Sequence, residues 1–271
     1  MRLVVRRTGA CGDVIQAIPI VKALETLGNQ VDFECASVLH GIARRFGIAV
    51  RSISRNHRVH INLDGSYERF RNQMGVRSML DMYLEHANSC LKQLGISIPS
   101  NLVPQPKMLR SRVRQKMPLF VAHSRPWVAI CPRSCSFRTK TVPDDIWNQA
   151  AKLLKGTAFW IGIHAPAPVN IIELSPKSFE DVADMLECVD AIATTDTGPM
   201  HIAASLNVPV VAIHQAYDPV MMLNRYSRVT VVKSTMDCIT CCHLECPKDK
   251  EHPPCNDISP EYIARTVNSV T

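Results

Sequence analysis

The turn Asp196-Thr197-Gly198 carries residue types that could bind a phosphorylated sugar. Pro199 suits the first turn of a helix, and the free N–H groups at a helix start attract an anion such as phosphate. Asp196 precedes those groups, and a carboxylate there can accept hydrogen bonds from sugar hydroxyls. An ordinary strand-to-helix connection capped by Thr197 explains the same residues, so both interpretations stay open at this point.

The residues on both sides of this turn predict the elements that hold it. Ala191–Thr195 is a short, partly β-branched run that suits a buried parallel strand, and Val208–Ile213 is a second such run. Between them we expect a helix that ends at Asn207, with an apolar face made of Met200, Ala203, Ala204 and Leu206. The turn is therefore expected at the carboxyl edge of a parallel sheet.

The start of the chain predicts another strand–helix–strand unit. Leu3–Val5 is a short strand, and the loop Thr8–Asp13 leads into a helix whose apolar face consists of Val14, Ala17, Ile18, Val21 and Leu24. The loop contains GACGD, which is not the GxGxxG fingerprint of dinucleotide-binding folds, so a nicotinamide-dependent enzyme is disfavoured. On its own, Asp13 in this position is typical of a helix N-cap.

The composition describes a globular protein with room for two modest domains. Its 271 residues are 46% apolar and 20% charged. No apolar run reaches the roughly 18–20 residues that span a bilayer, and the start lacks the features of a signal peptide. We therefore expect a cytoplasmic protein whose eleven cysteines are thiols or metal ligands rather than disulfides.

A cluster of cysteines near the C-terminus has a partial metal-binding pattern. A C-x2-C pair is followed by two further cysteines, and the set is Cys238, Cys241, Cys246 and Cys255. The other spacings, of four and eight residues, fit no common zinc finger. A structural Zn²⁺ site and simple packing of thiols both stay open.

The net charge of +7 is unevenly distributed along the chain. Residues 1–125 hold 19 Lys and Arg against 8 Asp and Glu, whereas residues 126–271 hold 12 against 16. This asymmetry indicates either a polyanionic partner for the first half or a basic surface that contacts only solvent.

Four stretches of the sequence follow one another in the order of a known family. They are the GDV…P…ALE…G pattern from Gly12, a K-x-x-P-x-x-x-W loop from Lys140, the segment Glu173–Val182, and DTGPMHIAASLNVPVVAI from Asp196. These stretches resemble the motifs of the heptosyltransferase family, glycosyltransferase family 9. Its members are GT-B glycosyltransferases that build the inner core of lipopolysaccharide.

The resemblance implies an α/β chain with the GT-B fold, in which two Rossmann-like domains with parallel sheets face each other across a cleft. Residues 1–122 would form the acceptor-binding domain, and residues 123–258 the nucleotide-sugar-binding domain with the cysteine-rich segment. The last helix, residues 259–270, is expected to pack back on the first domain.

The resemblance also implies roles for individual residues. Asp13 matches the family's catalytic base, and Lys140 matches a lysine that contacts the donor diphosphate. Donor contacts are implied for Ser134, Lys140, Lys177, Asp196, Thr197, Gly198, Met200 and His201. The acceptor side is expected to include Gly12, Arg44, Arg45 and Arg58.

By resemblance, the chain is an inverting glycosyltransferase that requires no cofactor for catalysis. The expected donor is ADP-heptose, and the expected acceptor is the anionic lipopolysaccharide core, which would bring the protein to the inner face of the membrane as a peripheral contact. Two alternatives stay open: sugar transfer to nucleic acid, such as a modified base of phage DNA, and an inactive nucleotide-sugar-binding protein. The segment His164–Pro168 departs from the family, because it lacks a carboxylate suited to ribose hydroxyls, and the nucleotide is left open.

Overall fold

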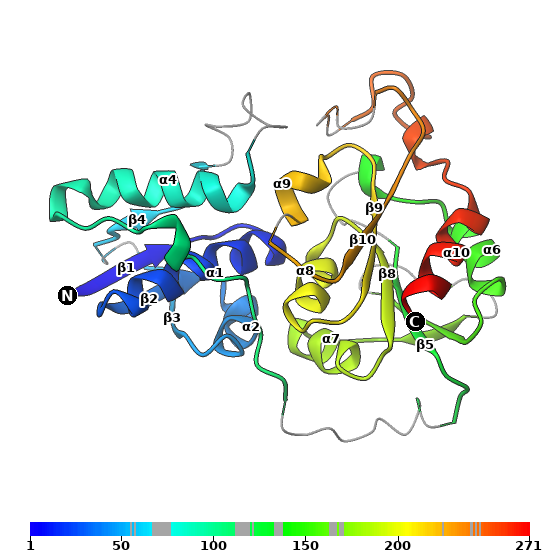
Figure 1. The fold of residues 1–271 in the computed structure, drawn as a ribbon, viewed down its shortest axis with the longest axis horizontal. Helices are drawn as coiled ribbons and strands as arrows, with labels where there is room; N and C mark the ends of the chain where they lie inside the picture. The colour runs from blue at the N-terminus through cyan, green and yellow to red at the C-terminus, as the bar shows by residue number, and fades with distance from the viewer. Residues whose placement is uncertain are drawn as a thin grey trace. The chain divides into compact units, whose positions relative to one another are not determined.

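The computed structural model describes residues 1–54, 56, 58–66, 77–111, 120, 122–132, 138–162, 167, 171–223, 225–238, 241, 243 and 245–271. Ser134 and most of His164–Pro168 lie outside them. The chain divides into two compact units (Figure 1). Unit 1 comprises Met1–Leu109 and Val220–Tyr226, and unit 2 comprises Arg110–Pro219 and Ser227–Thr271.

The chain passes from unit 1 to unit 2 after Leu109, earlier than the expected boundary after residue 122. The N–H of Leu109 donates to the Arg45 carbonyl oxygen at 2.8 Å, within unit 1. The side chain of Arg110 donates to the Leu206 carbonyl oxygen at 3.2 Å, within unit 2. These two bonds fix successive residues to different units, and this places the boundary between them.

Unit 1 is built on a parallel four-stranded sheet with the order β3-β2-β1-β4. Its strands are β1 (Arg2–Arg6), β2 (Gln30–Cys35), β3 (Ala49–Ser52) and β4 (Ile61–Asn62). Its α-helices are α1 (Cys11–Thr26), α2 (His40–Arg44), α4 (Met79–Leu91) and most of α9 (Pro219–Leu223), and its 3-10 helices are η1 (Ser37–Leu39), η3 (Lys92–Leu94) and η4 (Ser100–Leu102).

An amphipathic pattern produces α4, which packs against α1. Ser78 caps this helix, because its hydroxyl accepts the Asp81 N–H at 3.1 Å. The buried face of α4 consists of Met79, Leu80, Met82, Tyr83, Leu84, Ala87 and Leu91. Tyr83 on this face reaches the loop after β1, where it becomes part of a candidate site.

Unit 2 is built on a parallel six-stranded sheet with the order β10-β9-β8-β5-β6-β7. Its strands are β5 (Trp127–Cys131), β6 (Thr157–Ile161), β7 (Ile172–Leu174), β8 (Ala191–Thr195), β9 (Val210–His214) and β10 (Val229–Lys233). Its helices are α6 (Asp144–Lys152), α7 (Phe179–Leu186), α8 (Gly198–Ser205), α10 (Pro260–Val270), η5 (Arg138–Lys140) and η6 (Pro254–Asn256).

Helices cover both faces of this sheet, with α6 and α10 on one side and α7 and α8 on the other (Figure 1). Trp147 of α6 and Trp160 of β6 are fully buried in the core beneath α6 and α10. Each indole removes a large apolar area from water, which stabilises this layer. The predicted strand, turn, helix and strand of residues 191–213 are confirmed as β8, α8 and β9.

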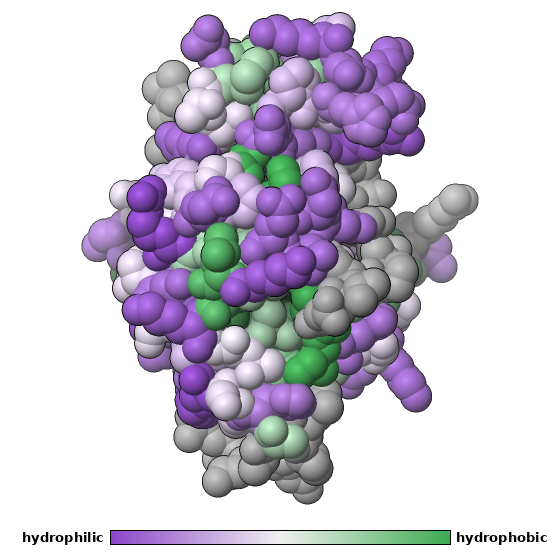
Figure 2. All heavy atoms as spheres, turned by 90° about the vertical axis from the view of Figure 1, so that its right-hand side faces the viewer, coloured by the Kyte–Doolittle hydropathy of each residue, from purple (hydrophilic) through white to green (hydrophobic). Residues whose placement is uncertain are grey.

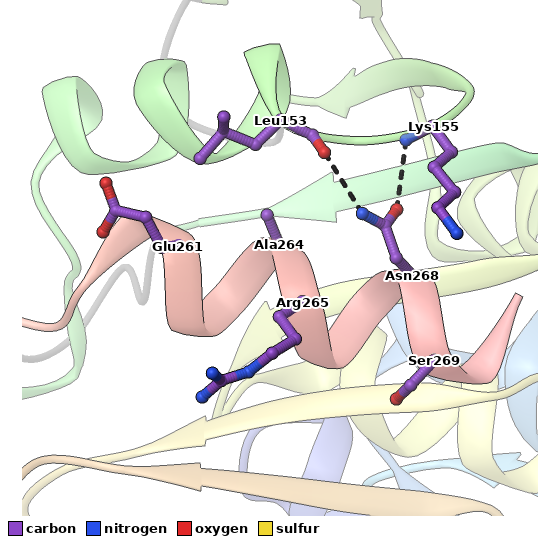
Figure 3. A pocket seen from close by; sticks show the side chains of 7 residues that line it. All are labelled: Leu153, Lys155, Glu261, Ala264, Arg265, Asn268 and Ser269. Atoms are coloured by element: carbon purple, nitrogen blue, oxygen red, sulfur yellow. Dashed lines mark hydrogen bonds between the residues drawn. The ribbon is translucent and has the colours of Figure 1, made fainter.

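The last helix, α10, is a member of unit 2, and its packing on the first unit stays a prediction. Ile263 and Val267 of α10 lie in the core of unit 2. The Asn268 side chain donates to the Leu153 carbonyl oxygen at 3.1 Å and accepts the Lys155 N–H at 3.0 Å (Figure 3). The apolar face of α10 is therefore already used to complete unit 2. A pocket between α10 and the end of α6 is lined by Leu153, Lys155, Glu261, Ala264, Arg265, Asn268 and Ser269.

A different segment of the second half of the chain joins unit 1. The Gln16 side chain donates to the Met222 carbonyl oxygen at 2.7 Å, and Arg225 lies 3.3 Å from Asp81 in an ion pair. Met221, Met222 and Leu223 are buried. The segment around α9 is therefore part of unit 1, although it follows most of unit 2 in the sequence.

Each sheet has one point where the strand order reverses. In unit 1 the chain adds β2 and β3 on one side of β1 and then places β4 on the other side. In unit 2 it adds β6 and β7 on one side of β5 and then places β8 on the other side. Ligands of open α/β sheets bind at such reversals, outside the carboxyl ends of the strands. A ligand is therefore expected at the loops after β1 and β4 in unit 1, and at the loops after β5 and β8 in unit 2.

No helix among the described residues is long and apolar enough to cross a membrane. Figure 2 shows the side of the molecule that carries α10. Hydrophilic residues cover most of that face, and the hydrophobic residues visible there form small separate groups.

Candidate functional site

Lys140 and Asp196 form a buried ion pair at the strand reversal of unit 2. Lys140 ends η5, after β5, and Asp196 follows β8. The Lys140 Nζ donates to Asp196 Oδ2 at 2.5 Å, and the two side chains are only 12% and 7% exposed. The Lys140 ammonium group also lies 4.0 Å from the ring centroid of Tyr217, which favours a cation at this position.

The groups around Asp196 hold its carboxylate in the ionised form. Burial raises the pKa of Asp196, but Lys140, His214 and His201 lower it by more, to about 2. The His201 Nε2, on α8, lies 3.9 Å from Asp196 Oδ1. The pKa of His214 is lowered, chiefly by burial, so its imidazole is neutral at pH 7. Of Lys140 and His214, Lys140 therefore carries the positive charge beside Asp196 at neutral pH.

Three buried polar atoms near the carboxyl ends of β8 and β9 have no hydrogen-bond partner among the described residues. They are Thr195 Oγ1, His214 Nε2 and Gln215 Oε1. His214 ends β9 and comes one residue after the Thr195–Ile213 pair, so it lies beside Asp196 in the sheet register. An unpaired buried polar group costs about 1–3 kcal/mol, which makes these atoms candidates for contacts with a polar ligand.

The start of α8 contains Thr197 and Gly198, two of the residues for which donor contacts were implied. Thr197 is the N-cap and Gly198 the first residue of the helix, where N–H groups lack intrahelical acceptors. Within α8, the Thr197 side chain makes no capping hydrogen bond, and its hydroxyl lies 3.2 Å from that of Thr194. Met200 differs from the expectation, because its N–H donates to the Thr197 carbonyl oxygen at 3.1 Å.

Lys177 lies farther along the same sheet edge. It is an exposed residue between β7 and α7, and its N–H donates to Asp181 at 2.9 Å. In the sheet order, β6 separates β7 from β5, the strand that precedes Lys140. The structure therefore brings Lys140, Asp196 and His201 together, whereas Lys177 belongs to a loop two strands away.

Asp13 lies at the strand reversal of unit 1, in the first turn of α1. Ala10 is the N-cap of this helix, and Asp13 Oδ2 accepts the Ala10 N–H at 2.8 Å. A Cβ at Gly9 would overlap Asp13 Oδ2 and the Arg7 guanidinium, so a larger residue there would displace these two side chains. The Asp13 side chain is 25% exposed. Asp13 therefore caps the helix from its third position while part of its carboxylate stays accessible.

Arg7 is a buried side chain that joins two carboxylates. Its guanidinium lies 3.2 Å from Asp13 and 3.1 Å from Asp64, and its Nε donates to the Tyr83 hydroxyl at 2.9 Å. Asp64, which follows β4, also accepts the N–H and the hydroxyl of Thr8, at 2.7 and 2.9 Å. This network fixes the loop around Asp13 from both sides of the strand reversal.

Arg7, Asp64 and Tyr83 were not among the residues that the sequence indicated. The available signals were weak: Arg7 directly follows an apolar strand, and Asp64 precedes a glycine after another apolar run. Arg7 is 57 residues from Asp64 and 76 from Tyr83, so no local pattern connects them. In unit 2, His214 was missed because it continues an apolar strand as one polar residue.

Two arginines expected on the acceptor side lie in or next to α2. Arg44 is exposed, and Arg45 donates to the Leu109 carbonyl oxygen at a long 3.4 Å. Gly12 is the second residue of α1, directly before Asp13. Gly12 is thus the neighbour of the candidate base, Asp13. Arg45 already uses part of its guanidinium for a hydrogen bond within unit 1.

Arg58 lies at the amino edge of the sheet of unit 1, opposite the edge that carries Asp13. It is exposed and precedes His60, whose N–H donates to the Val4 carbonyl oxygen at 3.0 Å. Because β4 runs parallel to β1, the residues before His60 approach from the amino edge. Asp13 follows the carboxyl end of β1, so the structure does not bring Arg58 to the edge that carries Asp13.

The four cysteines singled out near the C-terminus are free thiols in unit 2. Burial, with the neighbouring Cys241, Cys246 and Cys238, raises the pKa of the Cys255 thiol to about 11. This coupling indicates that the thiols lie near one another. Within the described ranges, however, no three His, Cys, Asp or Glu side chains are arranged to hold a metal ion.

Comparison with known proteins places the chain in a family. The model of glycosyltransferase family 9 (heptosyltransferase) matches residues 33–252. Similar solved structures include a family 9 glycosyltransferase from Veillonella parvula, with a TM-score of 0.73 and 16% identity over 99% of this chain and 96% of that one. None of the curated proteins compared with the chain matches it.

Two further structures from Escherichia coli have the same fold. ADP-heptose LPS heptosyltransferase II has a TM-score of 0.68 and 14% identity over 100% of this chain and 98% of that one. The iron-containing dodecameric glycosyltransferase TibC has a TM-score of 0.69 and 15% identity over 99% of this chain and 75% of that one.

The chain belongs to glycosyltransferase family 9, because the family model spans most of its length. It is therefore a glycosyltransferase. Its two parallel α/β sheets and its likeness to heptosyltransferases of known structure define the GT-B fold, which confirms the fold expected from the sequence.

Proposed function

We propose that this enzyme transfers a sugar from a nucleoside diphosphate to a hydroxyl group of an anionic acceptor, with inversion at the anomeric carbon. The observation that carries the proposal is the buried Lys140–Asp196 pair beside the start of α8. A cation next to helix N–H groups suits a diphosphate, and a carboxylate beside them suits sugar hydroxyls.

In the proposed donor complex, Lys140 contacts the diphosphate and Asp196 accepts a hydrogen bond from a sugar hydroxyl. Negative charge develops on the diphosphate as the bond to the anomeric carbon breaks. Lys140 and the N–H groups of Thr197 and Gly198 stabilise that charge. These groups belong to the protein, so the proposed charge stabilisation does not depend on a bound metal.

In unit 1, Asp13 is the proposed general base. The proton of the acceptor hydroxyl passes to its carboxylate as the hydroxyl oxygen attacks the anomeric carbon. Attack on the side opposite the diphosphate inverts the configuration. Arg7 and the Ala10 N–H hold the carboxylate in one orientation, which supports this role for Asp13.

The proposed donor is ADP-heptose, and the proposed acceptor is the lipopolysaccharide core. The family membership and the likeness to an enzyme named for ADP-heptose and LPS support both. With this acceptor the enzyme would work in the cytoplasm, in peripheral contact with the inner face of the membrane. The excess of Lys and Arg in residues 1–125 suits an anionic acceptor.

The same basic excess favours nucleic acid as a second candidate acceptor. The test is transfer from ADP-, GDP-, UDP- and dTDP-sugars to purified lipopolysaccharide core and to DNA, with products identified by mass spectrometry. Product on the core, with weak salt dependence of its capture, supports the main proposal. For DNA, each neutralised phosphate adds about 0.7–0.9 to the slope of log K against log salt. A steep salt dependence of DNA binding, with sugar transferred to DNA, would make nucleic acid the acceptor. Donor binding without any transfer would indicate an inactive binding protein.

A further inference from the structure

Asn256 joins two segments of unit 2 that surround Lys140. Its side-chain N–H donates to the Arg138 carbonyl oxygen at 2.9 Å, and its Oδ1 accepts the side-chain N–H of Gln215 at 3.1 Å. Asn256 is 6% exposed and Gln215 is 2% exposed. A buried amide that both donates and accepts fixes the separation of two segments, because the loss of either bond leaves a buried polar atom unpaired.

Both segments carry a residue of the Lys140 site. Arg138 begins η5, which ends at Lys140. Gln215 follows β9 and comes two residues before Tyr217, whose ring lies under the Lys140 ammonium group. Asn256 therefore connects the backbone that carries Lys140 to the loop that carries its aromatic partner.

The rest of the cysteine-rich segment, residues 238–256, makes further contacts with η5. The Thr139 hydroxyl donates to the His243 carbonyl oxygen at 3.0 Å, and Arg138 forms an ion pair with Glu251. The Arg138–Glu251 pair is exposed and contributes little. The Thr139 bond is a second anchor, since Thr139 is 1% exposed.

We propose that Asn256 is a positioning residue for donor binding, and that the cysteine-rich segment clamps η5 so that Lys140 meets the diphosphate in one geometry. Lysine has a long, flexible side chain, so its backbone must be fixed if the ammonium group is to be held in place. The inference rests on the proposed contact between Lys140 and the diphosphate. It adds a role for a segment that carries none of the proposed catalytic groups.

The test compares Asn256→Asp with wild type. Aspartate keeps the acceptor for Gln215 but removes the donor to Arg138 and adds a negative charge, so Thr139→Val, which adds no charge, is measured beside it. Asn268→Ala is the matched control, because Asn268 also joins two segments of unit 2 through its amide but lies on α10, against the end of α6. Thr139→Val removes the second anchor and provides an independent variant if Asn256→Asp folds poorly.

Calorimetry measures binding of one nucleoside diphosphate, which is the one that wild type binds most tightly among ADP, GDP, UDP and dTDP. Steady-state kinetics give the donor KM, the acceptor KM and kcat, and thermal unfolding gives the melting temperature. We expect Asn256→Asp to weaken diphosphate binding about 5- to 30-fold and to raise the donor KM similarly. The acceptor KM and kcat at saturating donor should stay within about threefold of wild type. Asn268→Ala should lower the melting temperature but leave diphosphate binding unchanged.

Lys140→Ala, measured in parallel, separates this inference from the function on which it rests. If Lys140→Ala leaves diphosphate binding unchanged, the proposed role of Lys140 fails. If Lys140→Ala weakens binding but Asn256→Asp and Thr139→Val do not, the clamp is overturned while the site stands. Equal weakening in Asn268→Ala would also overturn it, because the effect would then reflect general destabilisation of unit 2.

Discussion

The Lys140 Nζ lies 2.5 Å from Asp196 Oδ2, although 56 residues separate the two positions in the sequence. They meet because they follow β5 and β8, which are neighbours in the sheet at the point where its strand order reverses. The pair holds a cation and a carboxylate side by side before any ligand binds. In the proposed complex, the two groups contact different parts of the donor: Lys140 contacts the diphosphate and Asp196 contacts the sugar.

The two members of this pair should respond differently to substitution. Lys140→Ala removes the cation and should weaken binding of the bare nucleoside diphosphate by at least about tenfold, since a charge-assisted hydrogen bond contributes about 1.5–3 kcal/mol. Asp196→Asn should weaken the intact sugar donor more than the diphosphate. Calorimetry with both ligands measures the difference. If Asp196→Asn weakened the binding of both ligands equally, the proposed contact between Asp196 and the sugar would be contradicted.

Asp196 should also contribute to the acid sensitivity of the fold. Its pKa is about 2 in the folded protein, below the ordinary value of 3.8. The unfolded chain therefore binds more protons at low pH, and the stabilisation is present above the ordinary pKa and is lost as pH falls toward 2. In Asp196→Asn, the free energy of unfolding should fall by about 1 kcal/mol less between pH 5 and 3 than in wild type. Urea unfolding at each pH measures this, and identical pH dependence would contradict the assigned pKa.

Arg7 should matter for turnover rather than for donor binding. Arg7→Lys keeps the charge but loses the planar fork that reaches Asp13, Asp64 and the Tyr83 hydroxyl together. We expect kcat to fall about tenfold, because a misplaced base is a less effective one. The donor KM should be nearly unchanged. Steady-state kinetics decide, and a large rise in donor KM with normal kcat would mean that Arg7 acts on a different step.

Chelation separates a structural metal from a catalytic one. The proposed charge stabilisation comes from Lys140 and the start of α8, so EDTA treatment should leave the transfer rate within about twofold. Metal analysis of protein purified under reducing conditions without chelators tests the cysteine cluster, and less than a stoichiometric amount of zinc would leave only the packing of thiols. About one equivalent of zinc, with a melting temperature that falls on chelation, would instead show a structural site.

Local patterns in the sequence were sufficient to predict strands and helices such as β8 and α8, and the turns at which they end. The apolar run of β8, Pro199 at the start of α8 and the positive-φ residue Asn207 at its end all act over a few residues. The buried face of α4 follows its helical period as far as Leu91. Leu94 lies beyond that face, in η3, and is 39% exposed because the helical period changes there.

Long-range packing could not be predicted in this way. The bond between Gln16 and Met222 spans 206 residues and depends on where α9 packs, which no local pattern encodes. Residues 259–270 were expected to form a helix, but no local pattern says which core its apolar face joins. Met200 was expected to contact the donor, and the tight first turn of α8 uses its N–H.

In the proposed mechanism, Asp13 deprotonates the acceptor while unit 2 holds the donor. The most direct test is single-turnover sugar transfer by Asp13→Asn with donor affinity measured on the same protein. Asparagine keeps the shape and can still accept the Ala10 N–H, so the start of α1 should be preserved. We expect transfer at least about a hundredfold slower than in wild type, with donor affinity within about twofold. Transfer at a near-normal rate would contradict the account, because Asp13 would then only cap the helix.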